Sequence, residues 1–274
     1  MPELPEVETV ARGLRSQILG QRIEDVRLRR ASVLRGNPEA FAGLAGSRIA
    51  AIERAGKYLV FSLEGAKLRW QLLFHLGMTG QLVLAAPEAP LAAHTHAHLR
   101  LSGGRELRFR DPRRFGKIAL APAPAGGGFA LELGIAPGAE PLEIAAPAFV
   151  ALFRGRAAPI KSALMNQKLL RGLGNIYADE SLFRAGIHPR ARRVSAPRLR
   201  RLRLAIREVL HEAIAAGGSS ISDYVDSRGE PGWFHLQHRV YGRTGEPCPG
   251  CGRPIRRTVL AGRSAHFCAH CQKP

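Results

Sequence analysis

The sequence contains no apolar run that approaches the ~20 residues a membrane-spanning helix requires. Its amino terminus lacks the basic-then-apolar pattern of a secretion signal. Cysteine is absent until Cys248, and all 4 cysteines fall within the last 27 residues, which does not suit a disulfide framework. These absences exclude a membrane or secreted class, and we expect a soluble cytoplasmic protein.

Acidic residues are also few, since 22 Asp and Glu oppose 41 Lys and Arg, for a formal net charge of +19. So large an excess in a chain that is 45% hydrophobic, and so able to fold, points to a polyanionic partner, chiefly nucleic acid. Lysine supplies only 6 of the 41 basic residues. Where a lysine occurs instead of an arginine, its ability to lose a proton is a candidate reason. With 274 residues the chain fits one large domain or two ordinary ones.

The first half of the chain changes its periodicity once. Residues 5–19 predict a helix, because Val7, Val10, Leu14 and Ile18 recur at helical spacing before Gly20. From there to about residue 120, short β-rich runs between glycines predict a sandwich or barrel. Two such runs are 57–63 and 96–101.

The second half returns to helical patterns. Residues 121–147 are rich in Pro, Gly and Ala and are interpreted as an interdomain connection. Residues 197–215 predict a helix with one apolar face and one arginine-rich face. Residues 217–238 predict a long mobile loop, a kind of segment that is often functional.

The last residues carry the motif Cys248-x2-Cys251-x16-Cys268-x2-Cys271. Four thiolates at this spacing predict a closed tetrahedral Zn²⁺ site of structural type, with one ion per chain. His266 and His270 lie beside the second pair and remain possible substitutes for a thiolate. Residues 256–260 and 264–267 predict two strands, with 261–263 as the turn that presents Arg263 to a phosphate or a groove.

Pro2 is the most informative residue of the amino terminus. Removal of Met1 would leave a secondary amine, and an α-amino group titrates near pH ~8, so part of it is an uncharged nucleophile at neutral pH. Glu3 and Glu6 lie within reach in sequence. The alternative is an ordinary helix start, where proline and acidic residues are common.

Three further segments carry chemistry-bearing residues. Residues 161–180 predict two helices separated by Gly172-Leu173-Gly174-Asn175, which would expose backbone N–H groups to a phosphate or form a plain turn. Residues 111–116 place two arginines beside an aromatic residue, and residues 75–80 offer Met78, so both loops are candidate duplex wedges. His94, His96 and His98 alternate along a predicted strand face, where they would bind DNA or metal or be satisfied internally.

Together these motifs resemble the formamidopyrimidine-DNA glycosylases, a family of bacterial repair enzymes. The resemblance rests on residues 2–9, 75–80, 111–116 and 172–180 and on the terminal four-cysteine finger, in the family's order. The endonuclease VIII branch shares the terminal proline, the helix-two-turn-helix and the finger. It typically lacks Leu after Pro-Glu and the Asp-Pro-Arg-Arg-Phe-Gly loop, both of which occur here.

The resemblance implies an α+β multidomain fold. A leading helix and β-sandwich would form a catalytic domain over 1–125, followed by a linker over 126–147. A helix-two-turn-helix domain would span 148–240, with a lesion-capping loop at 217–238, and a β-hairpin zinc finger would span 241–274. Damaged double-stranded DNA would lie in the cleft between the domains. We expect a monomer that uses no membrane and works at the bacterial nucleoid.

The resemblance also implies roles for individual residues. Pro2 would attack C1′ of the damaged nucleotide with Glu3 as acid/base partner and Glu6 in support, while Lys57 and Arg263 would serve β- and δ-elimination. The remaining candidates would bind DNA: Met78, Arg113 and Phe115 as wedges, and His94, Arg156, Lys161, Asn175 and Tyr241 as phosphate contacts.

The implied activity is removal of oxidised purines from duplex DNA, with a Schiff base at Pro2 and strand cleavage by β,δ-elimination. Because a base within a duplex is out of reach, the enzyme must flip it out of the stack. Alternatives are an endonuclease VIII-like enzyme for oxidised pyrimidines and a non-enzymatic zinc-finger DNA-binding protein.

Overall fold

A computed structural model of the chain describes residues 1–66, 68–220 and 224–274. These residues form two compact units, one of Met1–Ile135 with Gly217–Gly232 and the other of Ala136–Ala216 with Trp233–Pro274. Within the described residues, no helix is both long and apolar enough to cross a membrane. The predicted domain limits stay predictions.

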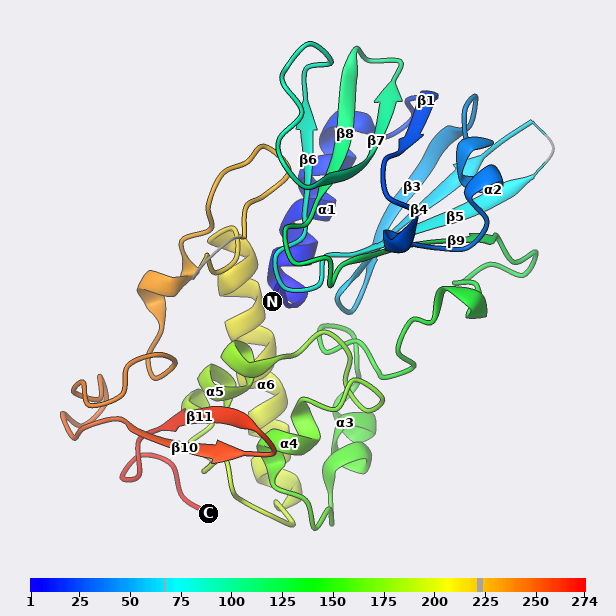
Figure 1. Cartoon of the computed structure of the whole chain (residues 1–274). Helices are drawn as coiled ribbons and strands as arrows, with labels where there is room; N and C mark the ends of the chain where they lie inside the picture. Colours follow the sequence, from blue (N-terminus) through cyan, green and yellow to red (C-terminus); the bar gives the residue numbers. More distant parts are fainter. Residues whose placement is uncertain (67, 221–223) are drawn as a thin grey trace. The chain divides into compact units, whose positions relative to one another are not determined.

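The first unit combines helices and two sheets (Figure 1). Its elements are α1 (Leu4–Ile18), β1 (Ile23–Leu28), η1 (Ala31–Val33), β2 (Leu34–Arg35), α2 (Pro38–Ala42), β3 (Arg48–Ala55), β4 (Tyr58–Glu64), β5 (Arg69–His75), β6 (Gln81–Ala85), β7 (Thr95–Leu101), β8 (Arg105–Arg110), β9 (Lys117–Pro122) and η2 (Leu131–Leu133). The strand orders are β1-β7-β8-β6 and β2-β9-β5-β4-β3. The pairs are antiparallel except β2 with β9.

One apolar core joins α1 to both sheets. Val7, Val10, Leu14 and Ile18 of α1 are each no more than 1% exposed, so the predicted apolar face is the buried one. Gly20 follows the helix with φ +83°, a conformation that suits glycine at a helix end. The predicted helix and β-sandwich are therefore confirmed.

Part of the predicted interdomain connection packs against a sheet of the first unit. The side chain of Gln71 on β5 donates to the carbonyl of Gly128 at 2.7 Å and accepts from the N–H of Ala130 at 2.8 Å. Ala130 and Leu133 are buried in a small cluster with residues of β4, β5 and β9. The carboxyl-terminal part of this stretch lies in the second unit, where α3 begins at Ala146.

The second unit is helical and ends in a β-hairpin. Its elements are α3 (Ala146–Phe153), α4 (Ile160–Leu164), α5 (Asn175–Arg184), α6 (Ala196–Ala215), η3 (Phe234–Gln237), β10 (Arg256–Leu260) and β11 (Arg263–Phe267). Helix α6 packs against α3 and α5 through the apolar face predicted for 197–215, and α5 also packs against β11.

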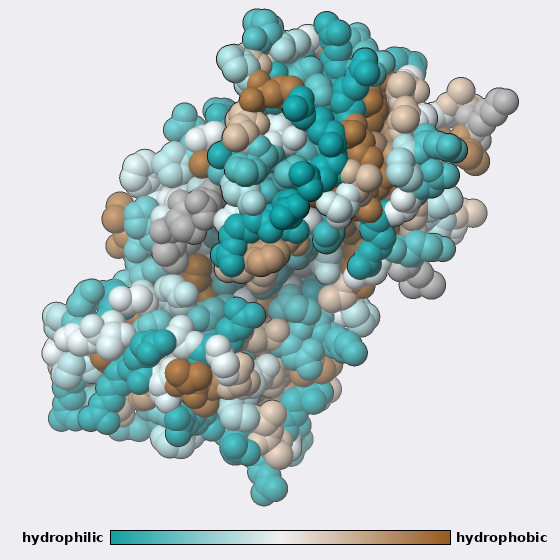
Figure 2. Space-filling view, in the orientation of Figure 1, coloured by the Kyte–Doolittle hydropathy of each residue, from teal (hydrophilic) through white to brown (hydrophobic). Residues whose placement is uncertain are grey.

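Hydrophilic side chains dominate the face of the chain that is shown in Figure 2, in keeping with its many charged residues.

The predicted mobile loop, residues 217–238, is divided between the units. Residues 217–232 belong to the first unit and the segment from Trp233 to the second, where it forms η3. Residues 221–223 lie outside the described residues.

Candidate active site and metal centre

The amino terminus of α1 brings Pro2, Glu3 and Glu6 together in a buried position. Glu6 accepts the backbone N–H of Glu3 at 2.7 Å with one carboxylate oxygen. Its other oxygen accepts the N–H of Ser219 at 2.8 Å, and the hydroxyl of Tyr224 donates to the Glu6 carbonyl at 3.2 Å. One carboxylate thus joins the start of α1 to the 217–232 segment.

Lys57 lies in the two-residue loop between β3 and β4, one residue before the strand in which the sequence placed it. Ala55 pairs with Tyr58 across this loop, and Gly56 has φ +59°. Glycine at the first loop position with positive φ is the pattern of a type II′ hairpin turn, which explains why β4 begins at Tyr58. The Lys57 side chain is buried, with 7% of its surface exposed.

His75 lies beside Lys57 and is neutral at physiological pH. Burial, followed by the charge of Lys57, lowers the pKa of His75 to about 4. Its Nδ1 accepts the N–H of Gly77 at 3.3 Å, which requires the neutral ring, and its ring packs 4.9 Å from that of Tyr58.

The wedge candidates project from two loops of the first unit. Met78 is 40% exposed and Phe115 is 53% exposed, although large apolar side chains are usually buried. The guanidinium of Arg113 lies 4.8 Å from the centre of the Phe115 ring. The structure thus presents an apolar and a cationic group side by side, as the sequence predicted.

The three alternating histidines do not share a strand face. His94 precedes β7 with φ +65° and is exposed, whereas His96 and His98 lie within β7. A register shift between Thr95 and Ala97 interrupts the strict alternation. His96 Nε2 bonds the Asp111 carbonyl and His98 approaches a glutamate on β8, so the interpretation of these two as internally satisfied holds.

Lys161 is placed differently from its prediction as a phosphate contact. Its ammonium is 1% exposed and forms a 2.6 Å ion pair with Asp179 on α5. The same ammonium donates to the carbonyl of Ser264. A charge held inside the unit by two partners is not presented to a phosphate, so this prediction is corrected to a structural role.

The glycine-rich turn before α5 is buried, which favours the plain turn over the exposed N–H groups, the two alternatives that the sequence left open. The N–H of Gly172 donates to the side chain of Gln167 at 2.8 Å, and residues 172–174 are buried. Asn175 is the first residue of α5, and its amide nitrogen donates to the hydroxyl of Ser264 at 3.0 Å. Its carbonyl oxygen is buried with no partner, so Asn175 keeps an unused acceptor.

Tyr241 is fixed by a buried carboxylate that sequence reasoning missed. Glu180 on α5 accepts the N–H groups of Arg239, Val240 and Tyr241 at 2.8–3.0 Å. Burial raises the pKa of Glu180, and these three bonds oppose that rise. The half-buried Tyr241 ring packs 5.0 Å from the ring of His266. Helix α5 therefore holds the chain where it enters the cysteine module.

Arg156 is exposed between α3 and α4, and its side chain donates to the carbonyl of Leu152. Arg263 is also exposed, but it is the first residue of β11 and pairs with Leu260. The turn has only two residues, Ala261 and Gly262, with φ of +46° and +73°. Two positive φ values characterise a type I′ hairpin turn, which corrects the three-residue turn of the sequence analysis.

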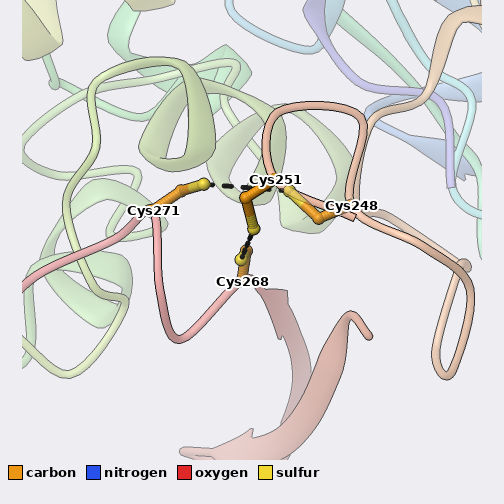
Figure 3. A group of neighbouring side chains, drawn as sticks. All are labelled: Cys248, Cys251, Cys268 and Cys271. Carbon is orange, nitrogen blue, oxygen red and sulfur yellow. Dashed lines mark hydrogen bonds between the residues drawn. The ribbon is translucent and has the colours of Figure 1, made fainter. Parts of the chain in front are cut away.

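The four cysteines converge as predicted (Figure 3). Their Sγ atoms all lie within 4.8 Å of one another, and the Cys251–Cys268 and Cys248–Cys271 pairs are 3.5 and 3.9 Å apart. Tetrahedral Zn²⁺ with bonds near 2.3 Å sets sulfur atoms about 3.8 Å apart, so the residues fit the ion. Among the described residues this is the one group that could hold a metal, and its four thiolates fill the coordination shell without a histidine.

Family models match most of the chain. Residues 1–118 match the formamidopyrimidine-DNA glycosylase N-terminal domain, and residues 133–225 match the H2TH domain of the same glycosylase. Residues 245–274 match a zinc finger found in FPG and IleRS.

The chain belongs to the formamidopyrimidine-DNA glycosylase family.

The sequence aligns with those of family relatives over their full length. The chain is 50% identical over 277 residues to the formamidopyrimidine-DNA glycosylase of Solibacter usitatus, and 44% identical over 278 residues to that of Stenotrophomonas maltophilia, with 100% of each chain covered. The crystal structure of the MutM (Fpg) protein of Thermus thermophilus matches with a TM-score of 0.84 at 44% identity, covering 99% of this chain and 98% of that one. A Lactococcus lactis Fpg mutant in complex with Fapy-dG-containing DNA matches with a TM-score of 0.89 at 36% identity over 100% of both chains.

Some residues that support these glycosylase motifs gave little signal in the sequence. His75 on β5 pairs with Tyr58, the residue after Lys57, and this strand pairing could have marked it as a neighbour of Lys57. Asp179 and Glu180 carry no sequence signal for their roles, because their partners lie 18 and about 60 residues away. Only tertiary packing reveals such buried carboxylates.

Proposed function

We propose that this chain is a bifunctional DNA glycosylase and AP lyase of base excision repair that removes oxidised purines from duplex DNA. The observation that carries the proposal is the buried Pro2–Glu3 start of α1, held by Glu6, in a chain of this family. A secondary amine beside a carboxylate supplies both the nucleophile and the proton acceptor or donor that base displacement requires.

The chemistry begins at Pro2. Once Met1 is removed, the ring nitrogen attacks C1′ of the damaged nucleotide, and the bond to the base breaks as the base takes up a proton. The C1′–O4′ bond of the sugar then opens, with a proton delivered to O4′, and the sugar is held as an iminium. Glu3 is assigned the proton transfers of this step, and Glu6 holds the backbone of Glu3 in place. The base must leave the duplex stack before this attack is possible.

Lys57 and Arg263 are assigned to the two eliminations. The iminium acidifies the C–H bond at C2′, so β-elimination needs a group that takes this proton while the bond to the 3′ phosphate breaks. The buried side chain of Lys57 is assigned to this step. A guanidinium group holds its proton too tightly to act as an acid, so the contribution of Arg263 is electrostatic stabilisation of the leaving phosphate.

DNA binding is assigned to groups on both units. Met78, Arg113 and Phe115 fill the gap left by the extruded base, and His94 binds the backbone from the same unit. From the second unit, Arg156, Asn175 and Tyr241 bind phosphates, and Asn175 lies beside the finger strand. The zinc ion, held by Cys248, Cys251, Cys268 and Cys271, fixes the hairpin and takes no part in the reaction. We place the protein as a monomer in the bacterial cytoplasm, at the nucleoid.

Incision of defined duplexes tests the substrate class. We expect the protein to cut a duplex with 8-oxoguanine opposite cytosine at least about 10-fold faster than one with thymine glycol, because the Arg113–Phe115 loop is present. A preference for thymine glycol would favour the endonuclease VIII-like alternative. Salt-dependent binding without incision of any lesion would favour the non-enzymatic alternative.

A further inference from the structure

Asp111 is a fully buried carboxylate at the base of the loop that carries Arg113 and Phe115. Its Oδ2 accepts the N–H of Gly116 at 2.7 Å, and its Oδ1 accepts the N–H of Arg113 at 3.3 Å. Oδ1 also accepts the hydroxyl of Thr79 at 2.5 Å, and Thr79 belongs to the other loop, which carries Met78. A single carboxylate therefore bonds both loops.

The two loops also meet at their backbones. A Cβ atom added to Gly77 would lie 2.4 Å from the backbone nitrogen of Gly116, so the chains cross closer than any side chain permits. The N–H of Arg113 lies 3.3 Å from the hydroxyl oxygen of Thr79, which adds a second bond between the loops. The loops thus share one support, although they are more than 30 residues apart in sequence.

The side chains on this support are the exposed wedge groups. Met78, Arg113 and Phe115 project outward, whereas Thr79, Asp111 and Gly116 beneath them are buried. Insertion into a duplex costs unstacking free energy, and that cost is offset only if the inserting groups are already in position.

We propose that Asp111, through Thr79, is a positioning residue that makes the Met78 loop and the Arg113–Phe115 loop one preorganised wedge. Asp111 touches no reacting atom, and its contribution falls on base extrusion rather than on the chemistry at C1′. The proposal rests on the proposed function, which supplies the extrusion step.

The test compares two substrates in single-turnover reactions of the full-length, zinc-loaded protein. One duplex carries 8-oxoguanine opposite cytosine and requires extrusion of a stacked base. The other carries a preformed abasic site opposite cytosine, which requires strand cleavage alone. We expect Asp111→Asn to slow the first reaction about 10- to 100-fold and the second less than about 3-fold, because Asn cannot accept both loop N–H groups and the Thr79 hydroxyl. A 2-aminopurine beside the lesion should report a correspondingly slower unstacking.

Matched variants separate positioning from damage to the fold. Thr79→Val removes only the hydroxyl that bridges the loops and should show the same selective loss, whereas Thr79→Ser keeps the hydroxyl and should restore activity. Asp25→Asn changes an exposed carboxylate on β1 and should leave both rates unchanged. If Asp111→Asn does not fold, the Thr79 pair decides the matter.

Two outcomes would overturn the proposal. Equal losses on both substrates, or no loss on either with Asp111→Asn and Thr79→Val, would show that the shared support does not act at extrusion. If the unsubstituted protein cuts neither substrate, the proposed function fails and the positioning role fails with it. The behaviour of the unsubstituted protein therefore distinguishes the two failures.

Discussion

Lys161 and Asp179 form a buried ion pair at 2.6 Å, and each side chain is no more than 1% exposed. The second oxygen of Asp179 accepts the N–H of His266 at 2.9 Å, and Lys161 also donates to the Ser264 carbonyl. These contacts attach strand β11 to helix α5 within the second unit. Because Arg263 begins β11, the ion pair sets the position from which its guanidinium extends.

Asp179→Asn should lower the free energy of unfolding by about 3 to 5 kcal/mol, because it leaves the Lys161 ammonium buried without its counter-charge. Urea unfolding of the zinc-loaded protein measures this loss, with Asp25→Asn as the exposed control. Where the variant remains folded, its products should shift from δ- toward β-elimination, since Arg263 loses its support. A loss below about 1 kcal/mol, together with unchanged products, would contradict the role assigned to the pair.

Removal of zinc should weaken DNA binding more than it disturbs the first unit. The four thiolates are the only metal group among the residues that the structure describes, and they lie wholly within the second unit. We expect about one zinc per chain by metal analysis. Chelation should reduce affinity for lesion duplex while circular dichroism retains the β-sheet signal. Full affinity in the metal-free protein would exclude the role proposed for the finger.

Acidification should destabilise the protein in part through His75. Its pKa is lowered to about 4 by burial and by Lys57, so the unfolded chain binds the proton more readily between pH 6.5 and 4. The neutral, buried His75 therefore contributes its full share to the free energy of unfolding above pH 6.5. This share is lost as the pH falls from 6.5 to about 4. The His75→Asn variant keeps an acceptor for the N–H of Gly77 but cannot take up a proton. Between pH 7 and pH 5, its free energy of unfolding should fall by about 2 kcal/mol less than that of the unsubstituted protein. Parallel losses in the two proteins, measured by urea unfolding, would exclude this contribution.

Much of the fold was predictable because its signals are local. The apolar spacing over residues 5–19 and 197–215 and the cysteine spacing describe α1, α6 and the finger without knowledge of distant contacts. The errors lie at turns, where one residue decides the geometry. Lys57 and Arg263 each fall one position from the predicted place. Lys57 belongs to a two-residue turn and not to the strand that follows it, and Arg263 begins a strand because the predicted three-residue turn has only two residues.

The sequence predicted which residues make up the candidate site better than it predicted what surrounds each side chain. Met78, Phe115 and Arg263 are exposed, as wedges and phosphate contacts must be, and their roles stay predictions. Lys161 did not match, because its partner Asp179 is chosen by the packing of α4 on α5 and not by any adjacent residue. The backbone N–H groups that Asp111 and Glu180 accept are likewise known only from the folded structure, because they come from residues that the sequence does not mark as partners.

Borohydride reduction of the protein on an 8-oxoguanine duplex, followed by peptide mapping, tests the central claim most directly. An iminium between Pro2 and the sugar is reduced to a stable amine, so mass analysis should locate the DNA adduct on the amino-terminal peptide that begins at Pro2, with Met1 absent. Pro2→Ala should strongly reduce the adduct while it retains most of the duplex affinity, because a primary α-amine replaces the secondary amine that forms an iminium directly. An adduct on any lysine, or undiminished trapping by Pro2→Ala, would contradict the account.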